Sequence, residues 1–149
     1  MTRRLIGALA IITTLLLSGC GNDYGVDQYG QKVAAERLDK QWLVVNYWAE
    51  WCGPCRTEIP ELNALAEQLK GQNVGVFGVN FDNVQGEELK AASDKLGIKF
   101  TVLAQNPDGI FEIPRSEALP VTYIIDDKGK VREQLMGEQT AEGVLAKLK

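Results

Sequence analysis

The sequence predicts an α/β fold in which a central mixed sheet is flanked by helices, and two observations support this. Apolar runs at residues 42–48 and 74–79 are each followed by a segment with helical spacing, which predicts two strand–helix units with parallel strands. Apolar runs at residues 121–125 and 131–136 are separated by a stretch that contains Asp-Asp-Lys-Gly, which predicts an antiparallel β-hairpin. A sheet with both kinds of strand pair is mixed.

Residues 1–19 are predicted to be a secretory signal peptide. Two arginines precede an apolar core at residues 5–17, which is too short for a comfortable transmembrane helix. Residues 17–20, Leu-Ser-Gly-Cys, resemble the lipobox of bacterial lipoproteins, in which the cysteine, here Cys20, is lipidated and begins the mature chain. The alternative is a plain secretory signal that leaves Cys20 as a free thiol, which would be a liability in an oxidising compartment.

The mature chain is expected to form one domain, residues 31–149, because its length suits one core and not two. Residues 20–30 are small and polar without periodicity, and we expect them to be a tether between the lipid and the fold. The chain has 20 acidic and 16 basic residues, so nucleic acid and anionic lipid are poor partners. Attachment to a membrane would therefore come from acyl chains at Cys20.

The first strand–helix unit is the best defined part of the pattern. Residues 42–48 form an almost continuous apolar run, which predicts a strand buried on both faces, with its aromatic residues as core. The helix after it has apolar residues at helical spacing and ends near Gly71; these residues are Ile59, Leu62, Leu65 and Leu69. Pro60 lies inside this helix and is expected to kink it.

The remaining elements follow in order. Residues 74–79 predict a second buried strand, and residues 87–96 predict a second helix. Residues 100–103 are compatible with a strand or a loop, and residues 106–109, Asn-Pro-Asp-Gly, predict a turn. After the hairpin, a last helix is expected from Thr140, which can be its N-cap, to residue 148.

Two cysteines separated by two residues stand at the start of the first helix, and they are the predicted reactive groups. A thiolate attacks disulfides, and the free N–H groups and positive dipole end at a helix start stabilise a thiolate at Cys52. Pro54 suits the first helical turn, and Gly53 lets a partner chain approach. Cys52 is therefore the predicted nucleophile and Cys55 the resolving thiol, which breaks the mixed disulfide formed with a substrate.

Other roles for the cysteine pair lack the residues that they need. The chain has no histidine, and its only other cysteine is Cys20, so a zinc site would lack ligands and copper delivery is disfavoured. Haem attachment needs histidine where Arg56 stands. A purely structural disulfide would close too small a loop to stabilise much. Redox activity without a metal or another cofactor is the prediction that remains.

Residues 48–55 resemble the active-site segment of thioredoxins, and two further features resemble the TlpA/ResA-like thiol-disulfide oxidoreductases of bacteria. Residues 55–60, Cys-Arg-Thr-Glu-Ile-Pro, match the pattern of an acidic residue three after the second cysteine and a proline two later. Residues 81–114 match an insertion of that family. The resemblance implies a thioredoxin fold with this insertion, protein disulfide substrates, and a membrane electron donor of the DsbD/CcdA type.

The same resemblance implies a substrate-binding surface around the cysteines. It implies that Pro120 is a cis proline facing them, and that the backbone of Leu119 binds a substrate segment in a strand-like manner beside Cys52. Trp51 is interpreted as a flat apolar platform next to Cys52 rather than as a reacting group. Together with Gly53 and Pro54, which lie between the cysteines, these residues form the expected substrate-binding set.

The chain departs from plain thioredoxins at the pair that is thought to relay protons. A buried aspartate and a lysine are expected there, but Asn46 and Gly78 occupy those positions. Glu58 is then the best acid–base candidate, because it lies one turn from Cys55 on the same helix. The competing interpretation is that Glu58 is an ordinary solvent-facing glutamate.

The sequence therefore predicts a lipid-anchored, extracytoplasmic oxidoreductase that reduces protein disulfides, in cytochrome c maturation or in other exported proteins. Two alternatives stay open: a thiol peroxidase, although Val45 and Ala49 stand where peroxiredoxins carry proline and threonine, and a non-catalytic partner-binding lipoprotein. In a cell with two membranes, Gly21 after Cys20 resembles the signal for the outer membrane, with the domain on the periplasmic face.

Overall fold

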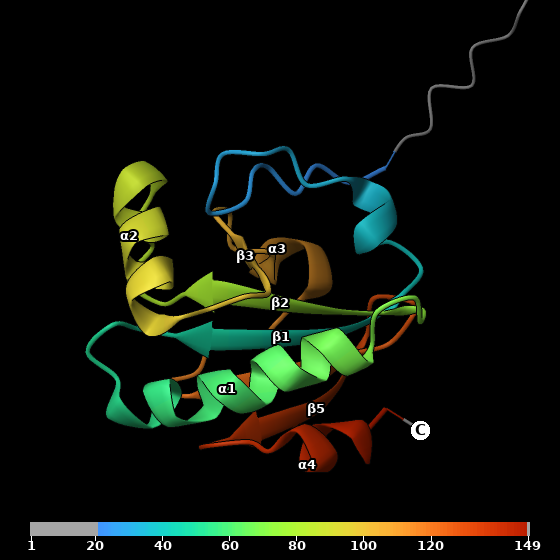
Figure 1. Cartoon of the computed structure of the whole chain (residues 1–149). Coiled ribbons are helices and arrows are strands. Elements are labelled where there is room, and N and C mark those ends of the chain that lie inside the picture. Colours follow the sequence, from blue (N-terminus) through green and yellow to red (C-terminus); the bar gives the residue numbers. More distant parts are fainter. Residues whose placement is uncertain (1–20, 149) are drawn as a thin grey trace, which may run out of the picture.

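The computed structural model describes residues 21–148, which form a five-stranded mixed sheet with helices on both faces (Figure 1). The strand order is β3-β2-β1-β4-β5. The elements in chain order are the 3₁₀-helix η1 (Ala35–Arg37), β1 (Trp42–Trp48), α1 (Gly53–Gln68), β2 (Val74–Asn80), α2 (Gly86–Leu96), β3 (Thr101–Leu103), α3 (Asp108–Phe111), β4 (Val121–Ile125), β5 (Val131–Met136) and α4 (Ala141–Leu145). The predicted α/β fold with a mixed sheet is confirmed.

Strand β1 lies at the centre of the sheet. It pairs in parallel with β2, where Asn46 faces Gly78, and antiparallel with β4, where Asn46 faces Thr122. Alternate side chains of β1 enter two separate cores. Val44, Asn46 and Trp48 face the side of α1, α2 and α4, and Leu43, Val45 and Tyr47 face the core formed with α3 and the N-terminal segment. The predicted burial on both faces is therefore confirmed.

Helix α1 begins at the cysteines and packs against the sheet with the predicted residues. Ile59, Leu62 and Leu65 are buried, and Pro60 lies inside a helix that continues to Gln68. The apolar stripe therefore positions the first turn of α1 at the carboxyl end of β1.

The N-terminal segment differs from the expected tether at residues 20–30. Tyr24 is 1% exposed, its ring stacks on that of Phe111, and its hydroxyl donates to Asp39 over 2.7 Å. Gln28 is 5% exposed, donates through Nε2 to the Phe100 carbonyl over 3.1 Å, and accepts from the Val102 N–H over 2.8 Å. The domain therefore begins before residue 31, because this segment covers the β3 edge of the sheet that would otherwise be open.

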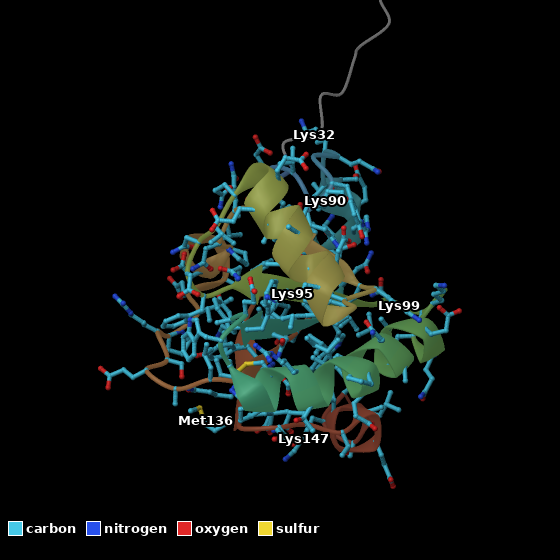
Figure 2. The ribbon with its side chains drawn as sticks, turned by 60° about the vertical axis from the view of Figure 1, so that its left-hand side comes forward. Lys32, Lys90, Lys95, Lys99, Met136 and Lys147 are labelled. Atoms are coloured by element: carbon cyan, nitrogen blue, oxygen red, sulfur yellow. A yellow bond between two sulfur atoms is a disulfide. The ribbon has the colours of Figure 1, made fainter. Side chains whose placement is uncertain are left out.

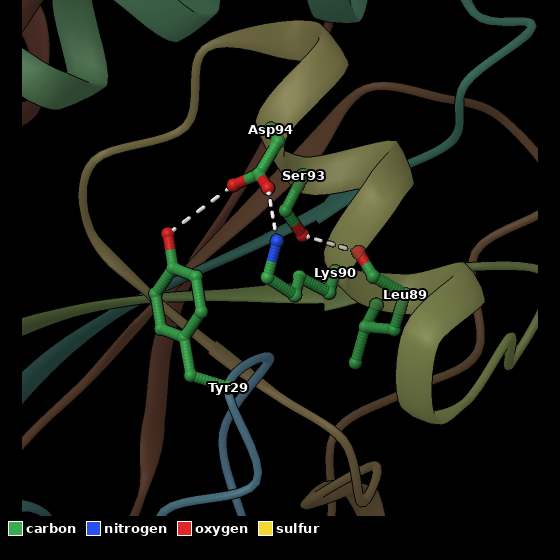
Figure 3. Close-up of polar contacts among 5 residues, drawn as sticks. All are labelled: Tyr29, Leu89, Lys90, Ser93 and Asp94. Atoms are coloured by element: carbon green, nitrogen blue, oxygen red, sulfur yellow. Dashed lines mark hydrogen bonds and ion pairs between the residues drawn. The ribbon is translucent and has the colours of Figure 1, made fainter.

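The N-terminal segment also reaches helix α2, as Figure 3 shows. The Tyr29 hydroxyl lies 3.4 Å from Asp94 Oδ1, and Lys90 donates to the other oxygen of the same carboxylate over 2.7 Å. Ser93 donates to the Leu89 carbonyl within the helix over 2.8 Å. The contacts of Tyr29 and Lys90 with Asp94 lie at the surface and add little stability, so the segment is held mainly by its buried residues.

Between α2 and β4, the sequence pattern allowed either a strand or a loop at residues 100–103, and the structure has a strand there. Residues 101–103 form β3, a short strand parallel to β2, and the turn predicted at residues 106–109 leads directly into α3. The predicted hairpin of β4 and β5 is confirmed as antiparallel. The last helix is confirmed with its Thr140 cap, which accepts from the Gly143 N–H over 3.1 Å, but it ends at Leu145.

Two predictions from the N-terminus, the signal peptide at residues 1–19 and the lipidation of Cys20, lie outside the described residues. Within residues 21–148, no helix is both long enough and apolar enough to cross a membrane.

Candidate redox site

Cys52 and Cys55 are joined by a disulfide at the first turn of α1, with their Cα atoms 5.3 Å apart (Figure 2). Cys52 is the N-cap residue, and its Sγ accepts a hydrogen bond from the Cys55 N–H over 3.2 Å. Pro54 is at the second helical position, where no N–H is needed. Cys55 is fully buried, whereas Cys52 is 4% exposed, so Cys52 is the more accessible of the two sulfurs.

An exposed indole borders the disulfide. Trp51 is 65% exposed, its Nε1 donates to Asp82 Oδ2 over 2.9 Å, and its ring meets that of Phe81 edge to face. A Cβ at Gly53 would meet no atom within 4 Å, so the surface over the disulfide is open. Lys95 of α2, labelled in Figure 2, forms a solvent-exposed ion pair with Glu50, the residue before Trp51.

The Leu119–Pro120 peptide bond is cis. It directly precedes β4, whose first residues lie beside the carboxyl end of β1, so it lies at the same end of the sheet as the cysteines. The Pro120 carbonyl accepts from the Gly137 N–H over 2.9 Å. Among residues 21–148, no hydrogen bond uses the N–H or the carbonyl of Leu119, so both are available to a bound segment.

Glu58 is buried at 1% exposure, so the interpretation as a solvent-facing glutamate is wrong. Its Oε1 accepts from Asn46 Nδ2 over 2.7 Å, and its Oε2 accepts from the Gln139 N–H over 3.1 Å. Burial raises the pKa of Glu58 to about 7, although these two hydrogen bonds oppose the shift. Glu58 lies three residues after Cys55, about one turn along the same helix, so a carboxyl with a pKa of about 7 is placed where it can influence the inner sulfur.

Asn46 and Gly78, which stand where plain thioredoxins carry the aspartate and the lysine, are partners in the register of β1 and β2 and so face each other. A Cβ at Gly78 would lie 2.9 Å from the Phe100 ring and 3.0 Å from Trp48 Nε1. A lysine therefore has no room at this position. The Asn46 amide is fully buried, and its Oδ1 has no partner among the described residues.

Sequence reasoning missed a cavity of about 230 Å³ at the same end of the sheet. It lies between the ends of β1, β2 and β4 and the loops around α3; its lining includes Tyr47, Asn80, Phe81, Asn106, Arg115 and Tyr123. Because these residues come from five separate segments, no local motif indicates the cavity. Only the strand order, which brings the carboxyl ends of β1 and β2 together, could have located it.

A CxxC pair at the start of the helix after the central strand defines a thioredoxin-like thiol-disulfide oxidoreductase, and solved structures share this fold. StoA from Bacillus subtilis matches with a TM-score of 0.66 at 16% identity, over 83% of this chain and 95% of that one. A thioredoxin family thiol:disulfide interchange protein from Chlorobium tepidum TLS matches with a TM-score of 0.66 at 25% identity, over 80% and 86%.

The chain belongs to the AhpC/TSA family, whose model matches residues 16–134. It is 32% identical to the thiol-disulfide oxidoreductase ResA of Bacillus thuringiensis (strain Al Hakam) over 123 residues, which are 83% of this chain and 70% of that protein. It is 29% identical to the thioredoxin-like protein YneN of Bacillus subtilis (strain 168), over 80% and 70%. The resemblance to ResA-like oxidoreductases is confirmed, and this chain is a thiol-disulfide oxidoreductase.

Proposed function

We propose that this chain reduces disulfides of exported proteins outside the cytoplasm through the Cys52 and Cys55 dithiol. The observation that carries the proposal is the arrangement of one accessible sulfur, one buried sulfur and one buried carboxyl on the first turns of α1. An accessible sulfur can attack a substrate, and a buried thiol beside Glu58 can resolve the product. Trp51 and the backbone of Leu119 offer a surface on which a protein segment can bind.

The reaction has two steps. The Cys52 thiolate attacks one sulfur of the substrate disulfide, which breaks the substrate bond, releases one substrate thiolate and forms a mixed disulfide. Cys55 then gives its proton to ionised Glu58 and attacks Cys52 Sγ, which breaks the mixed disulfide and releases the second substrate thiolate. The released thiolates are protonated, one by solvent and one by the proton that Glu58 took from Cys55. The substrate thus gains two electrons and two protons, and the chain is left with the Cys52–Cys55 disulfide, the state seen in the structure.

The proposal includes an acyl anchor at Cys20 and a membrane electron donor of the DsbD/CcdA type that restores the dithiol. The anchor rests on the resemblance of residues 17–20 to a lipobox. In a cell with two membranes it would hold the domain on the periplasmic face, at the outer membrane. Cytochrome c precursors and other exported proteins with disulfides are the proposed substrates.

The test is insulin reduction with matched cysteine variants. Cys52→Ser should abolish turnover, whereas Cys20→Ser, the same substitution outside the site, should keep turnover and lose membrane attachment. In the cell, Cys55→Ser should trap substrates as mixed disulfides on Cys52. Full activity without either site thiol would refute the proposal, and a reduction potential near about −120 mV, the value of a strong oxidant, would overturn the assignment as a reductant.

Peroxide is the competing substrate for a reactive thiol on this fold. Val45 and Ala49, at the positions where peroxiredoxins carry proline and threonine, are both fully buried apolar residues here. Neither can donate a hydrogen bond from its side chain to a bound peroxide. We expect no catalytic consumption of hydrogen peroxide by the reduced chain, as measured with excess dithiothreitol as the reductant.

A further inference from the structure

Two buried side-chain atoms of β1 have no hydrogen-bond partner. They are Asn46 Oδ1 and Trp48 Nε1, and among residues 21–148 no other buried side-chain nitrogen or oxygen is in this state. Both side chains are fully buried. One atom is an acceptor and the other carries a hydrogen, so the two are complementary although they do not bond each other. Buried polar groups that lack a protein partner are usually satisfied by an ordered water.

The Asn46 oxygen is directed toward β2. Asn46 has Thr122 of β4 as its register partner on one side and Gly78 of β2 on the other. Its Nδ2 donates to Thr122 Oγ1 over 3.0 Å. Because an amide is planar and its two terminal atoms diverge, the Oδ1 branch lies on the side of Gly78.

Trp48 brings its indole N–H to the same glycine. Trp48 is two residues after Asn46, so both side chains leave the sheet on the same face. Its Nε1 lies 3.0 Å from the position that a Cβ of Gly78 would take. The other neighbours of that position are a ring carbon of Phe100 and a methyl group of Val102, at 2.9 and 3.2 Å. The place over the glycine therefore combines one donor and one acceptor with apolar walls.

We propose that one water molecule binds between Asn46 and Trp48 as a fixed part of the fold, and that Trp48 thereby positions the amide that hydrogen-bonds Glu58. The water accepts from the indole N–H and donates to Asn46 Oδ1, so both atoms gain a partner. Gly78 is suited to this place because any side chain there would compete with the water for the space.

The water also decides which way the Asn46 amide points. An asparagine side chain fits the same space with its oxygen and nitrogen exchanged. In the exchanged orientation the NH₂ group would face the indole N–H, and the water would lose its acceptor. The bridge to Trp48 therefore holds Nδ2 on Glu58 Oε1, the contact of 2.7 Å that favours the ionised carboxyl.

NMR cross-relaxation with water tests the site on the oxidised, ¹⁵N-labelled chain. The measurement is made at about pH 8, above the pKa of Glu58, so that the carboxyl carries no exchanging proton. The Trp48 indole proton should show cross-peaks to water with opposite signs in NOE and ROE spectra, which mark a bound water and exclude exchange of the proton itself. Absence of these cross-peaks would overturn the water site.

Asn46→Leu removes the acceptor and keeps the indole probe. Leucine has nearly the shape of asparagine but leaves the water with one partner, so the cross-peaks should be lost. Thr122→Val is the matched control, because it removes the neighbouring hydroxyl, which can pass magnetisation from water by exchange. The cross-peaks should remain in this control, and their loss there would assign them to the hydroxyl and overturn the site. If Asn46→Leu does not fold, Gly78→Ala decides, because its Cβ would displace the water and abolish the cross-peaks.

Trp48→Phe tests whether the indole positions the amide. Without the N–H, the amide is free to turn its oxygen toward protonated Glu58, so the pKa of Glu58 should rise further, by about half a unit. The other groups that act on this carboxyl, the Gln139 N–H and the Glu138 charge, are the same in both chains. Trp42→Phe is the control, because it makes the same substitution at the other end of β1, and it should leave this pKa unchanged.

The infrared carboxyl band of Glu58 gives this pKa in the oxidised chain, so the result does not depend on whether the chain reduces proteins. An unchanged Glu58 titration in Trp48→Phe would overturn the positioning role of the indole. If Trp48→Phe does not fold, Gly78→Ala takes its place, since loss of the water should raise the same pKa. Insulin reduction tests the proposed function separately.

Discussion

Burial of the Glu58 carboxyl couples the stability of the chain to pH. Its pKa is about 7 in the folded chain, raised by burial from an ordinary value of 4.5. Between these two pH values the folded chain holds a proton that the unfolded chain has released, so stability falls as pH rises through this window. Below about 4.5 and above about 7 the contribution of Glu58 no longer changes with pH.

Glu58→Gln should remove this pH dependence. From pH 4 to pH 8, the unfolding free energy of the wild-type chain should fall relative to that of the variant by up to about 3 kcal/mol. Urea unfolding of the oxidised chains at several pH values measures the difference, and other titrating groups cancel because both chains share them. Parallel stability curves for the two chains would contradict the buried carboxyl.

The Asn46 amide controls how far the pKa of Glu58 rises. Its Nδ2 donates to Glu58 and, over 3.0 Å, to Thr122 Oγ1. Asn46→Leu removes the hydrogen bond that favours the ionised carboxyl, so the pKa of Glu58 should increase by about one unit. Thr122→Val is the control, because it removes only the second hydrogen bond of the amide and should shift this pKa much less.

The pKa of Glu58 in both variants is measured from the carboxyl band of protonated Glu58, which is followed in infrared difference spectra as the pH is varied. The alkylation rate of Cys55 against pH should follow the same shift if Glu58 takes the Cys55 proton. A displaced infrared titration with an unchanged alkylation profile would show that Glu58 titrates without serving the thiol.

The residues around the site differ in how far sequence could predict them. The pairing of Cys52 with Cys55 and the proximity of Glu58 to Cys55 follow from spacing on one helix, so both were predictable. The burial of Glu58 depends on Gln139, which lies 81 residues further along the chain and is brought near by the fold. No pattern around Glu58 contains that information.

At the scale of elements, periodicity predicted the long strands and helices, and it failed where contacts with distant residues decide the structure. Residues 21–30 have no periodicity, so they suggested a tether. Single side chains hold them instead: Tyr24 in the core of the α3 face, and Gln28 on the backbone of the edge strand β3. A three-residue strand such as β3 carries too short a pattern to be told from a loop.

Gln28→Ala should therefore destabilise the domain. It leaves the Phe100 carbonyl and the Val102 N–H without their partners in a buried place, at a cost of about 2 kcal/mol or more. Gln31→Ala is the matched control: Gln31 is exposed and its side chain makes no hydrogen bond with the described residues, so we expect a change below about 0.5 kcal/mol. Denaturant unfolding gives both values, and equal stabilities of the two variants would show that the segment is a tether after all.

For the whole molecule, the entry of the chain and the disulfide lie at opposite ends of the sheet. Asn22 bonds the Asp39 side chain, just before β1 begins, whereas Cys52 follows the end of β1. The seven residues of β1 span about 20 Å. Since Tyr24 is already in the core, only residues 21–23 separate Cys20 from the packed domain. An acyl anchor at Cys20 would therefore hold the disulfide away from the membrane that carries it.

An inserted linker tests this orientation. Fifteen Gly and Ser residues between Gly21 and Asn22 give a chain of about 20 Å root-mean-square length, enough to let the domain turn over. With acylated protein on vesicles, the insertion should speed reduction of a disulfide attached to a lipid headgroup by about tenfold, because the membrane-bound target gains access to Cys52. Insulin reduction in solution, the control, should not change, and mass spectrometry confirms acylation of Cys20. Equal rates on the lipid-bound disulfide would mean that the wild-type chain already presents Cys52 to its own membrane.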